Sequence, residues 1–232
     1  NNGYYSSSEK INMPLADFLT SENPKNHTDF LEKHSVDYVV LDETMIGKYQ
    51  AVSQISNRDN SEFTSMLQLS TSNNIQRSLS RDSNNNTVVQ FSRGQLGLYL
   101  PVEISQSGAE IRNDTAPTIE AGRRGKADCV LTPEGRREYD VEPIQLPGQY
   151  FGSGTGPTEV CVAINPYSNI ERSLSSSQAG RPRSASAVLV PKDISRSTLV
   201  RLYLMDGYGM EMFEKVEEGS PYDFVKMWEV TE

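Results

Sequence analysis

The sequence predicts an α/β protein of the mixed α+β type, with a split α/β core and a β-rich insertion. Two observations predict it: strand and helix patterns at both ends of the chain, and a middle section of short β-rich runs separated by turn residues. The chain has 232 residues, 36% of them hydrophobic, and is long enough to bury a substantial core. We expect residues 1–70 and 190–232 to form the core and residues 85–190 to form the insertion.

The first α/β unit lies in residues 28–55. Segment 28–33 opens with a capping hydroxyl and an early carboxylate, which predicts a short helix. The apolar, β-branched run 36–41 predicts a buried strand. Asp42-Glu43-Thr44 then supplies oxygens that can cap a second helix. Spacings of three and four place its apolar residues on one face: Met45, Tyr49, Val52 and Ile55.

Short β-rich runs dominate the middle of the chain. Pro133-Glu134-Gly135 between two of them predicts a hairpin, and the Gly-rich stretch 152–157 predicts a mobile loop. The polar stretches 72–86 and 173–186 are expected to be loops at the boundaries of the insertion. The expected strands are 87–91, 97–104, 127–131, 137–141 and 159–164.

The last segment returns to an α/β pattern. Asp193 or Ser195 can cap a helix that Asp206-Gly207 would end. Strands are expected over 212–216 and 224–230. The apolar residues of the helix are Leu199, Leu202 and Tyr203.

Composition excludes several classes of function. A net charge of -9 argues against a nucleic-acid partner, because binding to phosphates needs clustered Lys and Arg. No stretch approaches the roughly 20 apolar residues that a membrane-spanning helix needs. The first residue is Asn1 and no apolar leader follows it, so we expect the chain to begin within a longer protein.

Cysteine and histidine are scarce. Cys129 and Cys161 each lie in an apolar run, and no other Cys or His stands at a zinc-ligand spacing. Buried free thiols are the favoured interpretation, and a disulfide is the alternative. His27 and His34 flank one short helical stretch and are interpreted as surface residues, which leaves little material for His-dependent catalysis.

Two stretches carry a family resemblance. Residues 36–49 resemble the strand and helix that hold the short Asp/Lys or Met/Ile motif of oligosaccharyltransferase soluble domains. Residues 199–209, 213–216 and 225–230 are similar to the end of the archaeal members, and this is the more specific signal. The family's Trp-Trp-Asp-Tyr-Gly block is missing, since the single tryptophan is Trp228, and we expect the chain to begin downstream of it.

The resemblance implies the soluble, extracytoplasmic part of a membrane enzyme. That enzyme transfers a lipid-linked oligosaccharide to the Asn amide of an Asn-x-Ser/Thr acceptor polypeptide. Its catalytic acids and a divalent metal, Mn or Mg, belong to the membrane part, so this chain is expected to bind no metal and to supply no catalytic residue. The soluble domain would help to recognise the acceptor Ser or Thr.

Asp42, Met45 and Lys48 are the candidate acceptor-binding residues, and Met45 could form an apolar wall against the Thr methyl group. Each residue also has an ordinary interpretation. Asp42 can cap the helix, Met45 can fill the core, and Lys48 can be a solvated surface residue. Only the resemblance favours the binding role.

The alternative function is an extracellular carbohydrate-binding or surface-layer module without enzymatic activity. A free-standing hydrolase is disfavoured, because the chain offers no Gly-x-Ser-x-Gly turn and no evident pair of nucleophile and base. The gene sequence upstream of Asn1 would discriminate, since a Trp-Trp-Asp block after many hydrophobic spans indicates the transferase. Three Asn-x-Thr triplets begin at Asn26, Asn85 and Asn113 and could themselves be glycosylated.

Overall fold

The structure is a computed structural model of the chain. It describes residues 11–23, 25, 28–56, 64–72, 78–105, 108–152, 156–164, 185–216 and 225–231. Within these ranges, no helix is both long and apolar enough to cross a bilayer.

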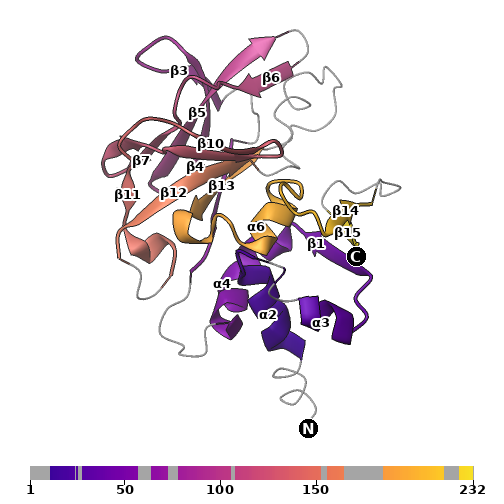
Figure 1. Cartoon of the computed structure of the whole chain (residues 1–232). Helices are drawn as coiled ribbons and strands as arrows, with labels where there is room; N and C mark the ends of the chain where they lie inside the picture. The colour runs from indigo at the N-terminus through magenta and orange to yellow at the C-terminus, as the bar shows by residue number, and fades with distance from the viewer. Residues whose placement is uncertain are drawn as a thin grey trace.

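The chain folds into short helices and many strands (Figure 1). The helices are α2 (Met13–Thr20), α3 (Thr28–Lys33), α4 (Thr44–Ser56) and α6 (Thr198–Tyr203), with short 3-10 helices η4 (Gly148–Tyr150) and η5 (Lys192–Ile194). The strands are β1 (Tyr38–Asp42), β2 (Leu67–Ser70), β3 (Leu79–Arg81), β4 (Thr87–Arg93), β5 (Leu96–Ser105), β6 (Gly108–Ile111), β7 (Thr118–Ala121), β8 (Arg124–Lys126), β9 (Cys129–Thr132), β10 (Gly135–Glu138), β11 (Gln145–Leu146), β12 (Thr158–Ile164), β13 (Ser186–Pro191), β14 (Phe213–Lys215) and β15 (Val225–Val230).

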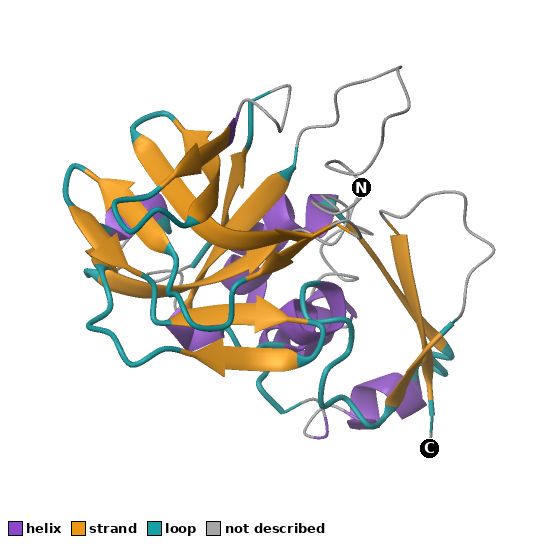
Figure 2. Ribbon diagram, turned by 90° about the horizontal axis from the view of Figure 1, so that it is seen from above, coloured by secondary structure: helices purple, strands orange, loops and turns teal. Residues whose placement is uncertain are grey.

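The strands form one large and one small sheet. The large sheet has 12 strands and runs β10-β9-β12-β13-β2-β4-β5-β7-β8, with β3, β6 and β11 pairing beside this path. The small sheet has three strands in the order β1-β15-β14. Figure 2 shows the strands beside the C-terminus set apart from the large sheet, with helices between them. The predicted mixed α+β class is confirmed.

The central strands of the large sheet are buried on both faces. Side chains of a strand alternate between its two faces, and β9 and β12 use both. Cys129, Leu131 and Cys161 pack with α2, α4 and α6. Val130, between Cys129 and Leu131, and Val162, which follows Cys161, pack into a second core inside the curled sheet. These continuous apolar runs are therefore typical of strands covered from two sides.

The small sheet closes the helical core from the other side. The inward-facing residues Leu41, Phe213 and Trp228 pack into the same core as the helices. The strand predicted over 36–41 and the two C-terminal strands are confirmed, with ends shifted by one or two residues. The prediction that the first of them is buried was wrong, because Tyr38 and Val40 are exposed and only Leu41 is fully buried. The sheet therefore joins the beginning and the end of the described chain, because β1 pairs with β15.

Several predicted elements are confirmed, whereas the stretch 72–86, predicted to be a loop, contains strand β3 at 79–81, which pairs with β4. The hairpin at Pro133-Glu134-Gly135 joins the antiparallel strands β9 and β10. The helix predicted near Asp193 begins later, and its cap is Ser197, whose side chain accepts from the N–H of Val200. Neither Asp193 nor Ser195 caps it, because both lie in or beside η5. Most of the predicted loops 152–157 and 173–186 lies outside the described residues.

Candidate functional site

The candidate residues lie where β1 ends and α4 begins. Asp42 is the last residue of β1, and its Oδ1 accepts a hydrogen bond of 2.7 Å from the N–H of Thr44. A hydrogen bond from the Thr44 hydroxyl is the main reason that the pKa of Asp42 is lowered, and the positive charge of Lys48 also lowers it. The Asp42 carboxylate is thus held ionised at the helix start, which is the usual role of a capping Asp.

Met45 and Lys48 follow on the first two turns of α4. Met45 is half-buried and packs against the helical core. Lys48 is exposed, yet it contributes to the low pKa of Asp42 through its charge. The structure therefore brings the three candidates together at one end of α4, with the two charged groups close enough to interact.

The buried face of α4 differs from the predicted face. Ile46 and Tyr49 are the buried residues of this helix, while Met45 and Val52 are only half-buried. The prediction that Ile55 shares the core face was wrong, because its side chain is 41% exposed. The helical spacing of apolar residues predicts which residues share a face, but not that only the first part of this face is covered by the core.

Tyr49 links α4 to the C-terminal helix. Its side chain is fully buried and forms a hydrogen bond with Ser197, the residue that caps α6. Burial is the main reason that the pKa of Tyr49 rises to about 12. Sequence analysis missed this contact, because 148 positions separate the two residues in the chain (197 minus 49).

A disulfide joins β9 and β12 beneath the helices. Cys129 and Cys161 are directly opposite in the parallel pair of strands, with their Cα atoms 4.7 Å apart. Both residues are fully buried. The favoured interpretation, two free thiols, was therefore wrong, and the alternative is correct.

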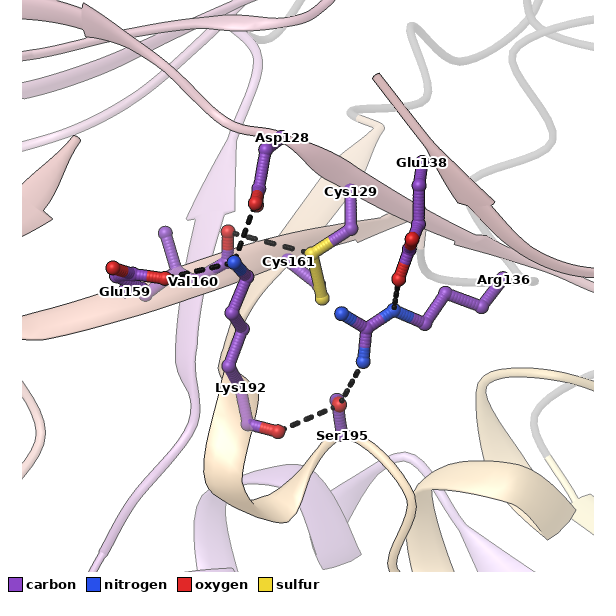
Figure 3. The surroundings of a disulfide bond; sticks show 9 residues. All are labelled: Asp128, Cys129, Arg136, Glu138, Glu159, Val160, Cys161, Lys192 and Ser195. Carbon is purple, nitrogen blue, oxygen red and sulfur yellow. Dashed lines mark hydrogen bonds and ion pairs between the residues drawn. A yellow bond between two sulfur atoms is a disulfide. The ribbon is translucent and has the colours of Figure 1, made fainter. Parts of the chain in front are cut away.

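Charged groups surround this disulfide (Figure 3). The Lys192 ammonium lies between the carboxylates of Asp128 and Glu159, and its distance to Glu159 is 2.8 Å. Burial tends to lower the pKa of Lys192, but the hydrogen bonds to both carboxylates outweigh burial and raise it. Arg136 Nη1 donates to the Ser195 hydroxyl at 3.1 Å. These contacts fix η5, which precedes α6, against the strands that carry the disulfide.

A second charged cluster joins the turn after α6 to the two C-terminal strands. The Lys226 ammonium donates to Asp206 Oδ1 at 2.8 Å, and Lys215 donates to Oδ2 at 2.9 Å. Burial alone would raise the pKa of Asp206, but the hydrogen bonds from the two lysines outweigh it and lower that pKa. Gly207 follows with φ +79, and a side chain here would collide with the ring of Trp228. The turn after α6 is thereby tied to β14 and β15.

The described residues offer no evident metal site. No three His, Cys, Asp or Glu side chains of this part of the chain lie close enough to hold a metal ion. His34 is exposed and its ring lies 4.9 Å from the ring of Phe30, whereas His27 lies outside the described residues. We therefore assign no metal ligand among the described residues.

Two of the three Asn-x-Thr triplets can be placed. Asn85 is exposed in the turn between β3 and β4, with φ 64, and its Oδ1 accepts from Arg81 at 3.0 Å. Asn113 is exposed in the loop between β6 and β7. Asn26 lies outside the described residues.

Two clefts lie away from the candidate residues. One, of about 530 Å³, is lined by Leu31 and Val36 near α3 and by Met212 and Val230 of the C-terminal segment. The other, of about 460 Å³, lies between β8 and residues 142–145. Neither is lined by Asp42, Met45 or Lys48.

Comparison with known proteins finds similar structures but no similar sequences. No family model matches the sequence, and no curated protein matches it. The C-terminal globular domain of the oligosaccharyltransferase from Pyrococcus abyssi matches 98% of this chain, with a TM-score of 0.47 and 13% sequence identity. The C-terminal domain of C. jejuni PglB matches 99%, with a TM-score of 0.40 and 12% identity.

The chain spans 44% of the length of the P. abyssi structure and 71% of the C. jejuni structure. Over nearly its whole length, the chain is thus similar in structure to C-terminal domains of two proteins, one of them described as an oligosaccharyltransferase.

Proposed function

We propose that this chain is the soluble domain of an oligosaccharyltransferase, the enzyme that transfers a lipid-linked oligosaccharide to Asn in Asn-x-Ser/Thr acceptors. In this proposal, the end of β1 and the start of α4 form part of the pocket for the acceptor Ser or Thr. The observation that carries it is the placement of Asp42, Met45 and Lys48 together at the strand-to-helix junction of residues 36–49.

The junction has the chemistry that such a pocket needs. Met45 is half-buried, so part of its side chain packs in the core while part remains accessible. An apolar surface of this kind can contact the methyl group of Thr, which Ser lacks. The hydrogen-bonding partner for the acceptor hydroxyl would come from the Trp-Trp-Asp block, which this sequence does not contain.

The disulfide supports an extracytoplasmic location for this domain. Disulfides form and persist in oxidising compartments, and they are rare where glutathione keeps thiols reduced. A fully buried disulfide between β9 and β12 therefore fits a domain that folds outside the cytoplasm. The catalytic acids and the Mn or Mg ion are assigned to the membrane part of the enzyme, and we derive no reaction step from this chain.

A pair of neighbouring substitutions in the full-length enzyme tests the pocket. Met45→Ala should raise the Michaelis constant for a Thr acceptor peptide more than for a Ser peptide, because the lost methyl contact is worth about 1 kcal/mol. Ile46→Ala is the matched control, since Ile46 is fully buried one position away. It should lower the melting temperature through a loss of about 2 to 4 kcal/mol without changing the Ser/Thr preference.

Lys48→Ala adds a second measurement at an exposed position. Under the proposal it weakens acceptor binding and leaves the melting temperature unchanged. An unchanged Ser/Thr preference in Met45→Ala, together with unchanged kinetics in Lys48→Ala, would exclude the pocket assignment.

A further inference from the structure

Strand β1 forms one edge of the small sheet. Among the described residues, β1 pairs only with β15. The carbonyl of Asp37 accepts a hydrogen bond from the N–H of Val230 at 2.9 Å. This bond shows which residues of β1 direct their backbone groups toward β15 and which direct them away. In an antiparallel pair, every second residue directs its backbone groups to the partner strand. The N–H and C=O groups of Tyr38 and Val40 therefore point outward, away from β15.

The outer face of this sheet is apolar at its centre. Tyr38 is 51% exposed and Val40 is 57% exposed, although both lie in a regular strand. Met227, directly opposite Val40 on β15, is 39% exposed. Proteins commonly protect exposed edge strands with Lys, Pro or a bulge, and β1 contains neither Lys nor Pro. Exposed apolar side chains on the face beside an edge strand are typical of an interaction surface.

Carboxylates surround the apolar centre. Directly opposite residues share a face of a sheet, so Glu229 lies on the same face as Tyr38, and Glu214 lies beside Glu229. Asp42 occupies the same face at the end of β1. In the described strands of the small sheet, no Lys or Arg takes an outward-facing position on this face. The surface is thus complementary to a strand that carries apolar and basic side chains.

We propose that an acceptor polypeptide binds, as an additional strand, to the edge of β1 that no described strand covers. This inference rests on the proposed function, and it names the way in which the substrate is held. Acceptors of the proposed enzyme share only Asn-x-Ser/Thr, and backbone hydrogen bonds from Tyr38 and Val40 can hold an extended chain of any sequence. Because β1 continues directly into α4, a chain on this edge passes beside Asp42 and the first turn of α4.

The proposal predicts a preference among acceptors. Segments with alternating Val and Lys beside the sequon, bound with Lys on the outer face, should bind more tightly than segments that place Glu there, because three carboxylates lie on this face. The difference should decrease at high salt, since exposed charges are screened.

Titration of the chain with synthetic peptides tests the proposal. The probe carries Asn-Ala-Thr followed by alternating Val and Lys, and binding is measured by calorimetry. Methylation of the peptide amides that face β1 should weaken binding by about tenfold or more, because two backbone hydrogen bonds are lost. Methylation of the amides in the other register is the matched control and should have little effect.

Val40→Pro gives the same test from the protein side. The substitution removes only the N–H of residue 40, which points away from β15, and an edge strand tolerates this loss. Because the peptide then loses one backbone hydrogen bond, binding of the unmodified peptide should weaken by about tenfold. If this variant does not fold, Met227→Lys provides a second test, since it repels the basic peptide without changing the backbone.

The outcomes separate the two proposals. Binding that is insensitive to amide methylation and to Met227→Lys overturns strand addition. Binding to this chain that depends on β1 supports strand addition, and an unchanged Ser/Thr preference of Met45→Ala in the full-length enzyme then overturns the Ser/Thr pocket alone. Concentration-dependent dimerisation of the free chain that Val40→Pro abolishes would identify a second copy, and not an acceptor, as the occupant.

Discussion

Reduction of the Cys129–Cys161 disulfide should substantially destabilise the chain. The bond closes a loop across a sequence separation of 32 residues. By lowering the entropy of the unfolded chain, a disulfide that closes a loop of that length stabilises the folded state by about 4 kcal/mol at room temperature. For a chain of 232 residues, losing this stabilisation on reduction should lower the melting temperature by about 8 °C.

Urea denaturation of the same protein with and without a reductant measures this effect. Oxidised and reduced wild-type chains contain the same side chains, so their difference isolates the crosslink from any packing change. The double variant Cys129→Ala/Cys161→Ala should lose at least as much stability, because truncating buried side chains also leaves cavities.

Two results would refute the reasoning. The first is a difference below about 1 kcal/mol between the oxidised and reduced chains, which is far less than the loop entropy requires. The second is alkylation of both cysteines in chain that has been unfolded without reductant, because a disulfide blocks this reaction.

Further predictions concern charge, pH and activity. Asp206→Asn should cost about 3 kcal/mol, because it leaves the buried Lys226 without its anion, whereas Lys226→Met should change stability by less than about 1 kcal/mol; denaturation of both variants tests the difference. Burial raises the pKa of Tyr49 to about 12 from 10.0, so the folded state binds this proton more tightly than the unfolded chain does. The free energy of unfolding should therefore be unaffected by this group below pH 10 and should fall by about 2 to 3 kcal/mol as the pH rises from 10 to 12. The variant Tyr49→Phe should lack this loss, and equal slopes in the two proteins would contradict the assignment. The isolated chain should form no glycopeptide from lipid-linked oligosaccharide and an Asn-x-Thr peptide, and product above a no-enzyme control would contradict the division of labour proposed above.

Local patterns alone determined much of the secondary structure. The apolar run 36–41 could be recognised as a strand, and Asp42-Glu43-Thr44 as a helix start, because each signal depends only on neighbours in the sequence. The hairpin at Pro133-Glu134-Gly135 was predictable for the same reason. The candidate residues Asp42, Met45 and Lys48 came from a resemblance in this segment, and their binding role stays a prediction.

The tertiary structure decided the contacts between distant segments. Cys129 and Cys161 pair because β9 and β12 are parallel neighbours, and no spacing in the sequence indicates that two strands are adjacent. Tyr49 meets Ser197 only because α4 and α6 share one core. Among the described strands, the edge position of β1 likewise depends on its pairing with β15, which joins opposite ends of the described chain. Periodicity fixes which side chains share a face, whereas the partner of that face, and the length over which it is covered, depend on how the whole chain packs.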